Sequence, residues 1–124
     1  MQFKHVCLLG IISSLPFGLA FVLAPEASSA IYGITGWNPG TATIGRLFGA
    51  ALLYVGATQI AVRGMTDVGV QRGLAIGFGL LSAVATVILA HAVIAGAANA
   101  MTWSSVVIYA FFVVAWASVA MRRT

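Results

Sequence analysis

The sequence predicts an all-α fold: an integral membrane four-helix bundle, with both termini in the cytoplasm and a short interfacial helix between the first two spans. Three observations predict it. Of the 124 residues, 61% are hydrophobic and only 6% are charged, whereas soluble domains carry about 25% charged residues. The apolar residues form four long runs, and basic residues stand at the ends of these runs. We therefore expect residues 1–124 to form a single transmembrane domain.

The four predicted spans are residues 5–24, 42–62, 73–94 and 103–121. Each is close to the twenty or so residues that a helix needs to cross the hydrocarbon. No run shows a sustained alternation of apolar and polar residues, which disfavours strands. Because backbone groups in lipid must be satisfied within the segment, helices are the expected state.

The connection between the first two spans predicts a short helix over about 25–32, lying on the outer interface. Pro25 suits the first helical position, and Glu26 suits the positive end of the helix dipole. A turn follows, and Thr41 or Thr43 is then expected to cap the second span.

Basic residues fix the predicted orientation. Positive charge gathers on the cytoplasmic side of membrane proteins, and five of the six basic residues fall on the side shared by the two termini and the second loop. The localisation expected is therefore a cell membrane crossed several times, in a bacterium the inner membrane. These five residues are Lys4, Arg63, Arg72, Arg122 and Arg123.

One alternative concerns the first run, which could be a cleaved signal peptide ending at Ala30. Its apolar stretch of about twenty residues is longer than a usual signal core, and Pro25 and Glu26 follow it directly. These features favour a retained span.

Small residues predict how the helices pack, since they let backbones approach closely in lipid. Gly45, Gly49 and Gly56 share one face of the second span, and the third span carries its own stripe of small residues. We expect these two stripes to meet inside the bundle, and dimerisation through an outward-facing stripe is the alternative. The stripe on the third span comprises Ala75, Gly79, Ser82, Ala83, Thr86 and Ala90.

The candidate ligand-binding residues are Glu26, Arg46 and His91. Arg46 lies about 25 Å from Arg63 along its helix, and His91 lies about 28 Å from Arg72, at 1.5 Å per residue. Arg46 and His91 should therefore share a depth near the outer edge of the hydrocarbon, beside Glu26. Ionisable residues in a membrane often mark a binding path, here for an anionic or quinone-like ligand.

A structural role would also account for these residues. Arg46 can pair with Glu26 or reach lipid phosphate, and His91 can be a hydrogen-bonded packing residue. Similarly, the polar residues Gln59, Tyr54 and Thr58 on the second span are expected to form hydrogen bonds between helices.

Several chemistries are not expected. Cys7 is the single cysteine, and the chain has too few His, Cys and carboxylate residues for a metal site. His5 and His91 fall near opposite faces of the membrane, which disfavours a bis-histidine haem. We therefore expect no catalytic residues, no cofactor and no metal. The basic residues form no cluster interleaved with aromatics, so no nucleic-acid partner is expected.

Three short motifs occur in the first sixty residues. The first predicted helix ends Leu23-Ala24-Pro25-Glu26, Tyr32-Gly33 follows, and the second run contains Arg46-Leu47-x-Gly49-Ala50-x-Leu52-Leu53-x-x-Gly56. In these motifs and in its four-span layout the chain resembles the DoxX-like group of four-helix bacterial membrane proteins. The resemblance implies a four-helix bundle with a polar position near the outer end of the second helix, where Arg46 stands. The group's namesake is similar to a membrane subunit of a thiosulfate:quinone oxidoreductase.

The function expected from the sequence is that of a small accessory or assembly subunit without catalysis, which binds lipid or a hydrophobic ligand near Arg46. Its expected partners are the lipid bilayer and either another membrane protein or further copies of itself. The alternative is a small oligomeric transporter or channel subunit, and a third is the membrane subunit of a quinone-linked oxidoreductase.

Overall fold

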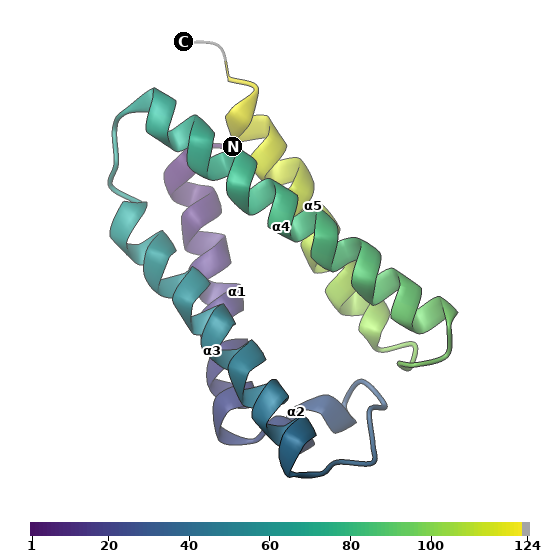
Figure 1. Ribbon diagram of the computed structural model, residues 1–124. Coiled ribbons are helices and arrows are strands. Elements are labelled where there is room, and N and C mark those ends of the chain that lie inside the picture. Colours follow the sequence, from purple (N-terminus) through teal and green to yellow (C-terminus); the bar gives the residue numbers. More distant parts are fainter. Residues whose placement is uncertain (123–124) are drawn as a thin grey trace.

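A computed structural model describes residues 1–122 and contains α-helices only within that range (Figure 1). Four of the helices are long and apolar enough to cross a membrane, so the predicted all-α class is confirmed and the chain is a small multi-pass membrane protein. A fifth, short helix lies between the first two. The helices are α1 (Phe3–Leu23), α2 (Pro25–Ala30), α3 (Pro39–Val62), α4 (Val68–Ile94) and α5 (Thr102–Ala120).

Two of the long helices begin earlier than their predicted spans because side chains cap them. The cap of α3 is Asn38, whose Oδ1 accepts from the backbone N of Thr41 at 3.0 Å, while Thr41 Oγ1 accepts from the backbone N of Asn38 at 2.8 Å. The predicted cap, Thr41 or Thr43, is therefore wrong. At the start of α4, Asp67 Oδ1 accepts from the backbone N of Val70 at 2.9 Å, which extends this helix back to Val68.

The Asn38 cap yields a direct test. Asn38→Ala removes Oδ1, which accepts from the backbone N–H groups of Gly40 and Thr41. We expect this change to lower the free energy of unfolding by about 0.5–2 kcal/mol. Thr43→Ala is the control, because the Thr43 hydroxyl donates to the Pro39 carbonyl at 2.9 Å and caps nothing. Thermal unfolding in a mild detergent would measure both. Equal losses in the two variants would contradict the assignment of Asn38 as the cap.

The glycine face of α3 packs against α1. An ideal Cβ placed on Gly49 would lie 2.7 Å from the Gly18 carbonyl oxygen and 2.7 Å from the Val22 nitrogen, so the two backbones touch here. Among the described residues, α3 and α4 form no packed interface. The predicted contact between the second and third spans is therefore wrong, because α1 supplies its own glycines opposite those of α3.

The small-residue stripe of α4 packs against α5 instead. Ala75 and Ser82 are buried, and a Cβ on Gly79 would lie 3.4 Å from Trp116 Cβ. The chain therefore folds as two helix pairs, α1 with α3 and α4 with α5, which Figure 1 shows diverging from one end.

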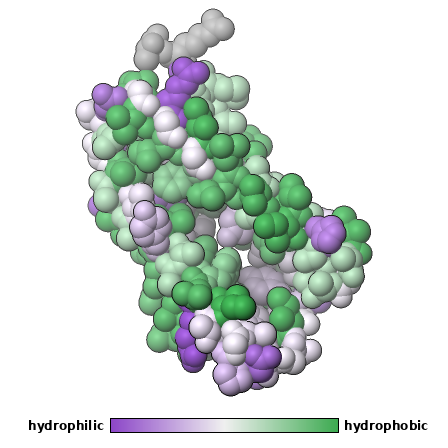
Figure 2. Space-filling model, viewed as in Figure 1, coloured by the Kyte–Doolittle hydropathy of each residue, from purple (hydrophilic) through white to green (hydrophobic). Residues whose placement is uncertain are grey.

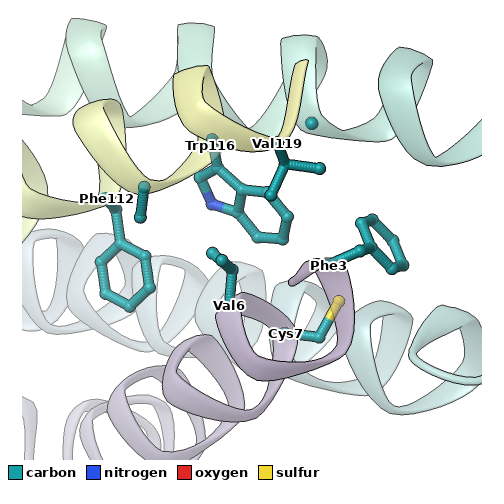
Figure 3. Packing of buried hydrophobic residues seen from close by; sticks show 8 residues of the cluster. Phe3, Val6, Cys7, Phe112, Trp116 and Val119 are labelled. Atoms are coloured by element: carbon teal, nitrogen blue, oxygen red, sulfur yellow. The ribbon is translucent and has the colours of Figure 1, made fainter. Parts of the chain in front are cut away.

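The two pairs meet at the end that carries the start of α1 and the end of α5, here called the terminal end. Trp116 is 1% exposed, stacks on Phe78 with centroids 5.1 Å apart, and meets Phe3 edge-on at 5.9 Å. In Figure 3 its indole points from α5 toward the first turns of α1, where Val6 and Phe3 face it. The terminal cluster comprises Phe3, Val6, Cys7, Ala75, Phe112, Ala115, Trp116 and Val119.

The opposite end, here called the loop end, holds α2 and the connections 31–38 and 95–101. Asn99 joins the two pairs, because its backbone N donates to the Tyr32 carbonyl at 2.9 Å and its Nδ2 to the Ile31 carbonyl at 3.0 Å. Gly33 has a positive φ of 75°, and a Cβ there would lie 3.0 Å from Asn99 Cβ. The pairs are thus tied at both ends and separated between them.

A candidate ligand cleft between the helix pairs

A cleft of about 640 Å³ lies between the two helix pairs, and its volume falls within the ~300–1,000 Å³ typical of small-molecule sites. The long helices α1, α3, α4 and α5 all contribute to its lining, as do both connections at the loop end. Figure 2 shows the molecule hollowed between the side formed by α3 and the side formed by α4. The cleft exists because these two helices do not pack together.

The walls of the cleft are mainly apolar and aromatic. On the side of the first pair, Phe21 of α1 and Phe48 of α3 meet edge-on with centroids 5.0 Å apart. Phe78 and Trp116 stack on the opposite side. Trp37, in the connection before α3, lines the cleft at the loop end. Such walls suit a hydrocarbon chain or a flat apolar ring.

The cleft is electrically neutral. Within residues 1–122, no Asp, Glu, Lys, Arg or His lines it. In the same range, no three His, Cys, Asp or Glu side chains lie together in a group that could hold a metal ion. Because moving an isolated charge into an apolar site is very costly, this lining disfavours a charged ligand.

Hydroxyl groups gather where the cleft meets the loop end. Ser105 Oγ donates to Tyr32 Oη at 3.3 Å. Thr102 is 2% exposed, and its Oγ1 is buried without a hydrogen-bond partner. This hydroxyl cluster comprises Ser29, Tyr32, Thr102, Ser105 and Tyr109, all of which line the cleft.

A single amide lies toward the terminal end. Gln59 is 3% exposed and lines the cleft, and its Oε1 is buried without a hydrogen-bond partner. The amide rests on Gly10 of α1, where a Cβ would collide with it. Beside it, the Ser14 hydroxyl donates to the Gly10 carbonyl of its own helix.

The predicted site residues lie elsewhere. Glu26, Arg46 and His91 are all exposed, and none of them lines the cleft. Gly45 faces Pro25 and Trp37, so Arg46, one position later, is turned about 100° away from that contact. His91 stands on α4, which does not pack against α3. Ligand binding by these three residues stays a prediction.

Sequence reasoning missed the cleft residues Gln59 and Thr102. Gln59 was expected to form a hydrogen bond between helices, but its oxygen has no partner, and Thr58 bonds the Tyr54 carbonyl within its own helix at 2.8 Å. The available signal was a lone amide in an apolar run, one turn after Gly56. Comparisons of the chain with protein-family models, with curated proteins and with solved structures find no match.

Proposed function

We propose that the protein binds an uncharged amphiphilic molecule from the bilayer, without catalysing a reaction, and acts as an accessory subunit of a membrane complex. The observation that carries this proposal is the apolar, neutral cleft of about 640 Å³ between two helix pairs. A cleft with apolar walls and polar groups at its two ends fits a molecule with a long apolar body and a small polar group.

Lateral entry from the lipid supports the proposal. Within the described range, α3 and α4 leave the cleft open between them because they do not pack. Their outer surfaces carry exposed large apolar side chains such as Leu47 and Leu80, whereas the exposed side chains of Ile44 and Leu81 line the cleft itself. A lipid-soluble ligand can therefore pass between these helices without entering water. The buried terminal cluster closes one end of the cleft, which favours binding over conduction of a solute across the membrane.

The proposed orientation places both termini in the cytoplasm of a bacterial inner membrane. Lys4 in α1, Arg63 after α3 and Arg72 in α4 all belong to the terminal end by chain order, and the positive-inside rule supports this assignment. The terminal cluster then faces the cytoplasmic leaflet and the hydroxyl cluster faces the outer one. Exposed Arg46 would reach lipid phosphate at the outer leaflet, and membership of the DoxX-like group is part of the same proposal.

Filling the cleft with a phenyl ring tests the proposed function. Ala51 of α3 lines the cleft, whereas Ala57 on the same helix is exposed and does not. We expect Ala51→Phe to weaken binding of a chain-brominated fatty alcohol on the order of tenfold, a difference of 1.4 kcal/mol, because the ring occupies the space of the chain. Ala57→Phe should leave binding unchanged.

Tryptophan fluorescence provides the measurement, because bromine quenches a nearby indole. A protein reconstituted in lipid nanodiscs with Trp37→Phe and Trp103→Phe retains only Trp116, which lines the cleft and is 1% exposed. A second protein with Trp37→Phe and Trp116→Phe keeps an aromatic ring in the terminal cluster and has Trp103 as its single tryptophan. Trp103 is 43% exposed and reports partition of the probe into lipid. The proposal would be overturned if quenching of Trp116 never exceeds quenching of Trp103. It would also be overturned if Ala51→Phe and Ala57→Phe change binding of the probe equally.

A further inference from the structure

We infer that Gln59 recognises the polar group of the ligand, and that this group is an uncharged hydroxyl. This inference rests on the proposed function of the cleft and adds the chemistry that is selected there.

Gln59 is a buried polar side chain that lacks a hydrogen-bond partner. The residue is only 3% exposed, and its Oε1 has no hydrogen-bond partner. Buried polar groups in folded proteins nearly always have partners, because leaving one unpaired is costly. A side chain of this kind on the wall of a ligand-sized cleft is explained by a partner that the ligand brings.

The side chains of α1 near this amide do not supply the missing hydrogen bond. Gly10 has no side chain, and that absence makes the space in which the amide sits. The nearby Ser14 hydroxyl is already engaged with the Gly10 carbonyl, so its proton does not serve Gln59. Ser13 is likewise engaged, with the Leu9 carbonyl at 2.9 Å. Neither serine donates to Gln59 Oε1.

The chemistry of the unpaired atom selects the ligand group. An amide oxygen only accepts hydrogen bonds, so its partner must donate one. An ammonium group donates but is charged, and the lining within residues 1–122 offers no counter-charge. Ketones, quinones, ethers and esters only accept, and would leave Oε1 unpaired. A hydroxyl donates to Oε1 and also accepts from the amide nitrogen.

Thr102 does not need a hydrogen-bond partner from the ligand, although its Oγ1 is also buried without a partner. A threonine hydroxyl rotates and can donate to backbone carbonyls three or four residues before it in the chain. The oxygen of Gln59 has no such option. The hydroxyl of the ligand is therefore placed at Gln59, and the apolar chain runs toward the loop end.

The test compares probes that share one brominated alkyl chain and differ only in the polar group: hydroxyl, methyl ether, sulfate and trimethylammonium. Quenching of Trp116 in nanodiscs is read for each probe, with Trp103 as the partition control. We expect the alcohol to bind the cleft that keeps Gln59 about five- to tenfold more tightly than the ether, the range expected of one net hydrogen bond. The two charged probes should bind more weakly still.

Substitution of the amide completes the test. Gln59→Leu keeps a side chain of similar size over Gly10, and we expect it to remove the preference for the alcohol over the ether. Gln71→Leu is the matched control, because Gln71 bonds the Met65 carbonyl and does not line the cleft. It should leave the preference intact.

The possible results separate this inference from the proposed function. Equal affinity of the reporter protein that keeps Gln59 for alcohol and ether would overturn the role of Gln59 and leave the cleft as a binding site. The same conclusion follows if Gln59→Leu weakens both probes equally. If no probe quenches Trp116 beyond the Trp103 control, the proposed function itself fails. The comparison of alcohol and ether on the protein that retains Trp116 as its single tryptophan and keeps Gln59 needs no further substitution, so it decides even if Gln59→Leu does not fold.

Discussion

Replacing Trp116 with alanine is expected to cause the largest loss of stability of any single truncation in the chain, on the order of 3–5 kcal/mol. Trp116 fills the centre of the terminal cluster, where it contacts Phe3 from α1 and Phe78 from α4. This cluster is where α1 meets α5, so the truncation removes packing both within the second pair and between the pairs. Thermal or denaturant unfolding in mild detergent measures the loss.

Trp103→Ala is the matched control for this substitution. Trp103 is 43% exposed near the start of α5, does not belong to the terminal cluster and does not line the cleft. Its truncation should change stability by far less. If the two alanine variants unfold at the same temperature, the terminal cluster does not hold the helix pairs together.

Gly49→Ala is expected to destabilise the α1–α3 pair by about 1–3 kcal/mol, the usual cost of overpacking. The added methyl would lie 2.7 Å from backbone atoms of both Gly18 and Val22. Backbone atoms cannot rotate aside as the end of a flexible side chain can, so the two helices must separate. The free energy of unfolding, measured by denaturant titration in mixed micelles, gives the size of the effect.

Gly77→Ala provides the comparison on α4, because a Cβ at Gly77 meets nothing within 4 Å. Alanine has a higher helix propensity than glycine by up to about 1 kcal/mol, so this variant should be neutral or slightly more stable. A Gly49→Ala protein as stable as the Gly77→Ala protein would show that the backbones of α1 and α3 do not touch at this point.

The helices themselves were predictable from the sequence, but their pairing was not. Long apolar runs specify helices because lipid offers the backbone no hydrogen bonds. The glycines of α3 correctly marked an interface, yet small residues permit close approach by any partner with a matching surface. Gly18 supplies that surface on α1. The helix α1 is apolar on all of its faces, so its sequence does not mark one face as the interface. Nothing in the spacing of α3 alone distinguishes α1 from α4.

The candidate site, like the helix pairing, was predictable from the sequence only in part. Depth along a helix follows from counting residues, and that reasoning selected Arg46 and His91. Their directions around the helix axes depend on which helices pair, and both side chains are exposed outside the cleft. Gln59 was assigned to helix packing because a polar side chain in a span normally finds a neighbouring helix. Its special position depends on Gly10, forty-nine residues earlier in the chain, which only the fold brings beside it.

The uncharged lining of the cleft has a consequence for energised membranes. A transmembrane voltage does work only on charge, about 2.3 kcal/mol for each elementary charge carried across 100 mV. A neutral molecule that enters between α3 and α4 moves no charge through that field, and the residues it meets carry none. Under the proposed function, occupancy of the cleft therefore follows the concentration of the ligand in the lipid and does not depend on the membrane potential.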